Sequence, residues 1–113
     1  MRNSEDVEGK LQQLQLFEQN LQGFMLQKQA LEMQLAEIAS ALSELQGVKS
    51  AYRIIGNVMI SSSRDALQAD LESRRETSEL RIKTLEKQEL LIRERAEKLQ
   101  KEVLSAIKDA KED

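Results

Sequence analysis

The apolar residues of this chain follow a heptad spacing that breaks only once, in the segment from Gly47 to Ser63, GVKSAYRIIGNVMISSS. On either side of the break the chain is rich in leucine, glutamate, glutamine, lysine and arginine, and it contains no proline. This composition is typical of long helices or coiled coils. A disordered chain need not keep its apolar residues in phase. We therefore expect two long helices separated by one short segment of a different kind.

The first predicted helix covers residues 4–46 and has one apolar seam, meaning the residues at the two heptad positions that face a partner helix. Ten of the twelve seam residues are apolar over six heptads, which predicts a coiled-coil strand. Gly47 lies where a C-terminal glycine cap belongs. The seam consists of Val7, Leu14, Leu21, Lys28, Leu35 and Leu42 at one position and of Lys10, Phe17, Phe24, Leu31, Ile38 and Leu45 at the other.

The second predicted helix covers residues 63–111. Ser62 with Asp65 three residues later fits a capping box, and Ser61 and Ser63 are alternative caps. Eight of its eleven seam residues are apolar. Because the two helices have nearly equal length, they can pair antiparallel along their full extent. The second seam consists of Leu71, Arg75, Ser78, Ile82, Leu85, Glu89, Ile92, Ala96, Leu99, Val103 and Ala106.

Residues 48–62 are predicted to form a β-hairpin. The turn is expected at Ile55-Gly56-Asn57, because glycine and asparagine accept the positive φ values of a tight turn. Alternation predicts one apolar face, carrying Tyr52, Ile54, Val58 and Ile60. An isolated two-stranded hairpin is marginal in water, so we expect hairpins of several chains to pair into an intersubunit β-barrel. The predicted oligomerisation residues are Tyr52, Ile54, Ile55, Val58, Met59 and Ile60.

These features together resemble the β-class subunit of prefoldin, most nearly the archaeal type, over almost the whole chain. The resemblance lies in Gln27-Lys28-Gln29 with Glu32-Met33-Gln34, in the Tyr52 to Ile60 hairpin, and in the run from Leu80 to Glu89. It implies that residues 1–113 form a single prefoldin-like domain. It also implies a hexamer of two α-class and four β-class subunits (α2β4), built as a double β-barrel with six coiled coils. In this family the coiled-coil tips hold unfolded polypeptides and pass them to a group II chaperonin without ATP.

Apolar residues near the free ends of the two helices are the candidate substrate-binding residues. Leu11, Leu104 and Ile107 lie beside the seam and are not needed to fill it, which favours a binding role. For Leu14 and Leu99 an ordinary place in the seam is the better explanation, although helix ends fray and such residues can open at modest cost. The full predicted set is Val7, Leu11, Leu14, Leu99, Val103, Leu104 and Ile107.

Composition argues against several other functions. The net charge of −3 is mixed along the chain without a basic stripe, so nucleic acid is a poor partner. No apolar run approaches the roughly 20 residues that span a bilayer, and the first residues lack the apolar core of a signal peptide, so we expect a cytoplasmic protein without membrane contact. Histidine and cysteine are absent, and the carboxylates have no predicted pocket. We therefore expect no enzyme, no cofactor and no metal site.

Two functions from different classes remain. The first is an ATP-independent holdase, a chaperone subunit that binds unfolded polypeptides and does no chemistry. The alternative is a non-enzymatic coiled-coil tether or scaffold for one specific folded partner. Exposed leucine and isoleucine outside the seam favour the chaperone, because a specific helical partner requires a continuous apolar stripe.

Overall fold

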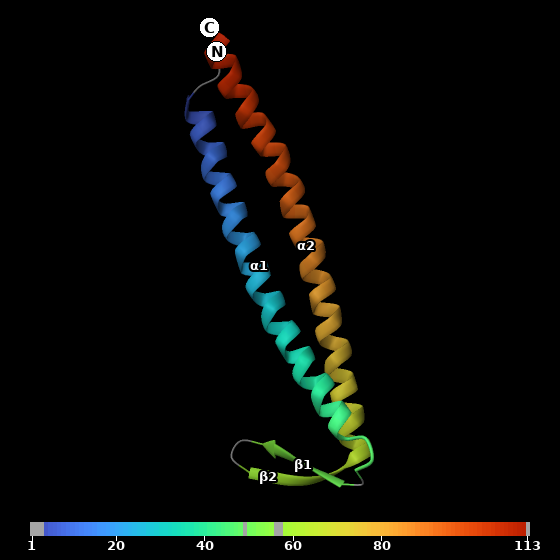
Figure 1. The fold of residues 1–113 in the computed structure, drawn as a ribbon. Helices are drawn as coiled ribbons and strands as arrows, with labels where there is room; N and C mark the ends of the chain where they lie inside the picture. Colours follow the sequence, from blue (N-terminus) through green and yellow to red (C-terminus); the bar gives the residue numbers. More distant parts are fainter. Residues whose placement is uncertain (1–3, 49, 56–57, 113) are drawn as a thin grey trace. The chain divides into compact units, whose positions relative to one another are not determined.

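The computed structural model describes residues 4–48, 50–55 and 58–112, and side chains within 5–48 and 63–111. Helix α1 covers Ser4–Glu44, strand β1 Ser50–Ile55, strand β2 Val58–Ser63 and helix α2 Arg64–Glu112 (Figure 1). The order helix, hairpin, helix is therefore the predicted one. Helix α1 ends two residues earlier than expected and the hairpin starts later. The predicted turn residues Gly56 and Asn57 lie outside the described residues.

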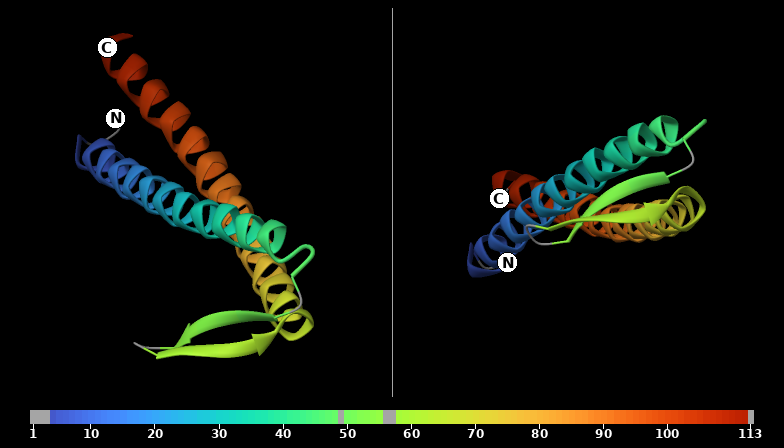
Figure 2. Two further views of the ribbon diagram at one scale, coloured as in Figure 1. Left: turned by 60° about the horizontal axis from the view of Figure 1, so that its bottom comes forward. Right: turned by 90° about the horizontal axis from the view of Figure 1, so that it is seen from below.

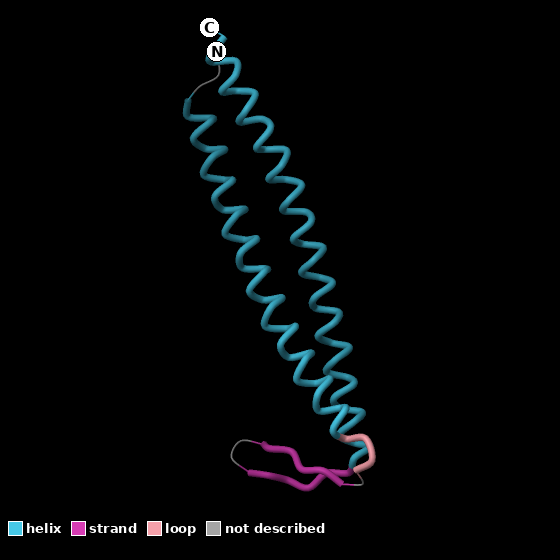
Figure 3. The backbone as a smooth tube through the Cα atoms, viewed as in Figure 1, coloured by secondary structure: helices cyan, strands magenta, loops and turns pink. Residues whose placement is uncertain are grey.

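The contacts of the chain group into two units, each of which contains one segment of α1 and one of α2. Unit 1 is formed by Met1–Gln27 and Thr84–Asp113, and unit 2 by Lys28–Lys83, which includes the hairpin. Figure 3 distinguishes the helical segments in cyan from the two strands in magenta.

In unit 1 the predicted seam residues of both helices are buried or half-buried, from Val7 to Phe24 on α1 and from Leu85 to Ala106 on α2. Val103 and Ala106 are the most enclosed, each with 4% of its surface exposed. The Lys10 ammonium reaches the Glu102 carboxylate at 3.5 Å, which pairs the start of α1 with the end of α2. The segments therefore pack antiparallel, and the heptad prediction is confirmed here.

In unit 2 the seam residues of α1 are likewise buried or half-buried, and Leu45 closes the seam at 7% exposure. On α2 the small residue Ser78 occupies the seam and is buried. Arg75, also predicted in the seam, is exposed. A guanidinium stays in water unless it is paired, which explains why this position leaves the seam. An open groove lies over Ser78 and Ile38, where the small serine leaves space.

The segment that leaves α1 has the predicted glycine cap. Gly47 has a φ of 81°, a left-handed conformation that glycine adopts without steric cost. The Leu45 and Gln46 amides donate to the Ala41 and Ser43 carbonyls at 3.1 and 3.3 Å, and these bonds tighten the last turn.

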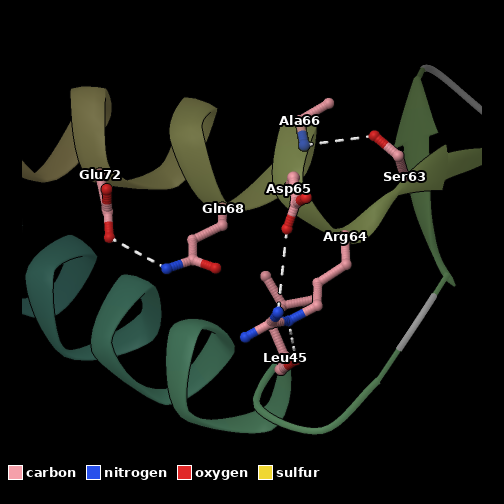
Figure 4. Close-up of polar contacts among 7 residues, drawn as sticks. All are labelled: Leu45, Ser63, Arg64, Asp65, Ala66, Gln68 and Glu72. Carbon is pink, nitrogen blue, oxygen red and sulfur yellow. Dashed lines mark hydrogen bonds and ion pairs between the residues drawn. The ribbon is translucent and has the colours of Figure 1, made fainter.

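An arginine and a serine at the start of α2 stabilise both helix ends in unit 2 (Figure 4). The Arg64 Nε donates to the Leu45 carbonyl at 2.8 Å, across the hairpin in sequence. No basic residue lies in the last turn of α1, so Arg64 brings the positive charge that favours a helix C-terminus. The Ser63 hydroxyl accepts the Ala66 amide at 3.2 Å. Ser63 is thus the N-cap, and the first choice, Ser62, was wrong.

Strands β1 and β2 form a two-stranded antiparallel sheet, visible as adjacent arrows in Figure 2. The register pairs Ile54 with Met59 and Ile55 with Val58. Directly paired residues belong to the same face and neighbours along a strand to opposite faces. One face therefore includes Tyr52, Ile54 and Met59, and the other Ile55, Val58 and Ile60. The prediction of a single apolar face was wrong, because it did not take the pairing between strands into account.

The bond from Arg64 to the end of α1 generates a stability prediction. We expect Arg64→Ala to lower the free energy of unfolding by about 1–2 kcal/mol, because the Leu45 carbonyl loses a charged donor. Urea unfolding followed by circular dichroism at fixed protein concentration measures this change.

The matched control for this prediction is Arg74→Ala. Arg74 pairs with Asp70 at 3.1 Å on the exposed surface of α2, and such a pair contributes only about 0.3–0.5 kcal/mol. Arg64→Lys, which keeps the charge without the guanidinium, should fall between the two. Equal losses for Arg64→Ala and Arg74→Ala would show that the bond to Leu45 does not stabilise the chain.

Candidate functional site

The candidate binding residues lie in unit 1, where the start of α1 and the end of α2 meet (Figure 1). Three of the seven predicted residues are well exposed: Leu104 with 60% of its surface, Leu11 with 46% and Ile107 with 41%. Large apolar side chains are therefore uncovered at the predicted substrate-binding site.

The other four predicted residues lie in the seam. Val7, Leu14 and Leu99 are half-buried, and Val103 is buried at 4% exposure. They expose less of their surface than Leu11, Leu104 and Ile107 while the helices are paired. Contact between Val103 and another molecule would require the helix ends to separate, which is least costly near a helix terminus.

The two flanks of the seam differ in chemistry. Each seam alternates between two heptad positions. In an antiparallel pair, a residue that directly follows one of these positions on α1 lies on the same flank as a residue that directly follows the equivalent position on α2. Leu11 directly follows Lys10 and Ile107 directly follows Ala106, so both lie on one flank, and Leu104 lies one turn before Ile107. We call Leu11, Leu104 and Ile107 the apolar flank.

The opposite flank is polar. The Lys10 to Glu102 ion pair lies on it, and a shallow groove there is lined by Gln13, Arg95 and Glu102 among others. Both partners of the ion pair are partly solvated, so the pair contributes at most about 1 kcal/mol. The charged and amide groups of this flank are solvated by water. The apolar surface formed by Leu11, Leu104 and Ile107 thus lies on one side of the seam only.

The predicted oligomerisation residues all lie on β1 and β2, where the strand pairing brings them together. Tyr52, Ile54 and Ile55 are on β1, and Val58, Met59 and Ile60 are on β2. The register distributes them over both faces of the hairpin. Neither face is therefore entirely polar.

Sequence reasoning missed several exposed leucines away from the helix ends. Leu16, Leu26, Leu80, Leu90 and Leu91 are each more than half exposed. The signal was available, because these residues lie outside both predicted seams. Apolar residues outside the seam were considered as binding residues only near the helix ends.

Neither a metal cluster nor a membrane-spanning helix is found in the part of the chain that the structure describes. None of its groups of acidic side chains has the arrangement of three or more ligands that could hold a metal ion. Its helices, although long, contain no segment apolar enough to cross a bilayer.

Comparison with known proteins agrees with the fold and with the arrangement of the two helices. The family model for prefoldin subunits matches residues 8–110, almost the whole chain. The chain belongs to the prefoldin family. Prefoldins are chaperones, and membership implies assembly with other prefoldin subunits. The predicted family and the fold of two long helices joined by a hairpin are confirmed.

Individual relatives are archaeal prefoldin β subunits. The prefoldin subunit beta of Pyrobaculum calidifontis is 41% identical over 86 residues, which is 74% of this chain and 69% of the relative. That of Thermococcus kodakarensis is 30% identical over 105 residues, 90% of each chain. The crystal structure of the prefoldin beta subunit from Thermococcus strain KS-1 superimposes with a TM-score of 0.82 and 31% identity, covering 89% of this chain and 91% of that one.

Proposed function

We propose that this chain is a β-class subunit of a cytoplasmic, ATP-independent holdase, which binds non-native polypeptides at the end of unit 1. The observation that carries this proposal is the apolar flank, where Leu11, Leu104 and Ile107 are exposed on the same side of the seam. Exposed apolar residues at one place mark a surface that binds other molecules. Because helix ends open at modest cost, residues near them can adapt to partners of irregular shape.

The proposed mechanism requires no chemistry. A non-native chain exposes apolar side chains that a folded protein buries, and these side chains bind the apolar flank with the hydrophobic effect as the driving force. Each contact is weak, so the helix pairs of several subunits must bind one substrate together to hold it. Release follows when the substrate is transferred, without nucleotide hydrolysis.

The hairpin joins the subunits and so brings their helix pairs together. A two-stranded sheet has two open edges and is marginal in water by itself, and both faces of this one carry apolar residues. Pairing with the hairpins of other subunits covers these surfaces. Two α-class and four β-class subunits (α2β4) joined in a β-barrel are the assembly that the family suggests, and a group II chaperonin is the proposed recipient of the substrate.

The apolar flank provides the first functional prediction. We expect the double substitution Leu104→Ser and Ile107→Ser to weaken binding of unfolded citrate synthase about tenfold, because two exposed apolar contacts are removed. Suppression of citrate synthase aggregation, measured by light scattering against chaperone concentration, reports the loss. Helix content should not change, since both residues are exposed.

The control for the flank is Leu80→Ser with Leu91→Ser, two leucines of α2 with similar exposure outside the flank. This variant should suppress aggregation as the unsubstituted chain does. If the flank variant remains fully active, or if the control loses as much activity as the flank variant, the apolar flank is not the binding site.

The hairpin register generates a second prediction. Ile54 and Ile60 lie on opposite faces, so we expect Ile54→Glu and Ile60→Glu each to dissociate the oligomer, because each places a charge in a covered apolar face. Native mass spectrometry measures the subunit number, and circular dichroism should still show the helices.

Gln46→Glu is the matched control for the hairpin variants, because Gln46 is exposed next to the end of α1 and gains the same charge outside the hairpin. Its oligomer should remain intact. Retention of the full oligomer by both isoleucine variants would contradict assembly through the hairpin.

A further inference from the structure

A second exposed apolar surface lies on α1, on the side that faces away from the seam. In unit 1 it includes Leu16 with 58% and Leu26 with 62% of its surface exposed. Gly23 lies between them, seven residues after Leu16 and three before Leu26, and these spacings place all three on one side of the helix. We call Leu16, Gly23 and Leu26 the α1 outer face.

The α1 outer face is almost free of charge. Glu18 is the only charged residue between Leu11 and Gln27, and the other polar residues of this stretch are glutamines and one asparagine. α2 in the same unit also exposes Leu90 and Leu91, but its outer side carries Lys87, Glu94 and Lys101 around them. Only one helix of the pair therefore presents an apolar surface that lacks charges.

Gly23 leaves a notch in the α1 outer face. Apart from the two neighbouring residues and the backbone of its own helix, nothing lies within 4 Å of the place where a Cβ would be, so the space over the glycine is open. Leucine side chains on either side of an open notch form two separate apolar contacts. The neighbouring glutamines offer hydrogen-bond donors and acceptors to a backbone without selecting for charge.

We propose that the α1 outer face is a second contact site for non-native polypeptide, which binds short uncharged apolar segments of the substrate already held at the apolar flank. This inference rests on the proposed holdase function. It adds a contact in the body of α1 to those at the helix ends, and it assigns this additional contact to α1 and not to the charged outer side of α2.

A helix of a second copy fits this surface less well. Helix pairing requires a continuous apolar stripe with flanking charges that set the register. Here the stripe is interrupted by Gln19 and Gly23, and the flanks are amides. A flexible extended segment needs neither continuity nor charge, and the broken, neutral surface matches it.

Site-specific photocrosslinking tests the proposal with the full-length assembled chain. The chain contains no cysteine, so a benzophenone maleimide can be attached at one introduced cysteine alone. The variants are Leu26→Cys on the α1 outer face, Leu104→Cys on the apolar flank and Glu94→Cys on the outer side of α2. The probe is guanidine-unfolded citrate synthase, with native citrate synthase as the control substrate.

We expect crosslinks to unfolded citrate synthase from Leu26→Cys and Leu104→Cys and background yield from Glu94→Cys. Because no charge contributes, the yield at Leu26→Cys should not fall at high salt. In the cysteine-free chain, Leu16→Ser with Leu26→Ser should weaken binding of unfolded citrate synthase about tenfold, since two exposed leucine contacts are removed.

The outcomes separate this inference from the function on which it rests. Crosslinking at Leu104→Cys with only background yield at Leu26→Cys would overturn the α1 outer face and leave the holdase proposal standing. Crosslinks from Leu26→Cys to another subunit would assign the face to assembly and overturn it as well. Background yield at all three sites would overturn the holdase proposal together with the inference.

Discussion

The seam between α1 and α2 is the interaction on which the rest of the structure depends. Neither helix is stabilised by propensity alone, because most helical stability in proteins comes from packing an apolar face. In both units the seam residues are buried or half-buried, while most other side chains of the helices are exposed. The two segments in each unit therefore stabilise one another, and the exposed large apolar residues of the two helices remain available for other contacts.

The proposed function depends on the apolar residues that lie outside the seam. A chain with a compact core would bury most of its leucines, but a pair of helices has only one side to bury. Leu11, Leu104 and Ile107 remain exposed on the apolar flank, whereas the opposite flank is made polar by the Lys10 to Glu102 pair. The same reasoning separates the neutral outer face of α1 from the charged outer side of α2. The candidate binding surfaces therefore consist of apolar residues that do not pack in the seam.

Much of this arrangement could be predicted. The sequence predicted the heptad residues, the glycine cap at Gly47 and the exposure of the apolar flank. Each of these depends on spacing or on a single backbone conformation. The faces of the hairpin and the bond from Arg64 to Leu45 were not. Both join residues that are distant in sequence, and a list of alternating residues does not say which partner lies opposite.

Heptad periodicity is a local property of a helix, so the order of amino acids is enough to predict that two helices form and which side of each is buried. Only the tertiary structure decided how the remaining side chains are distributed. The antiparallel pairing brings Leu11 of α1 to the same flank as Leu104 and Ile107 of α2, and the strand register divides the apolar hairpin residues between two faces. These assignments depend on which residues become neighbours across elements, and that is settled only when the elements pack.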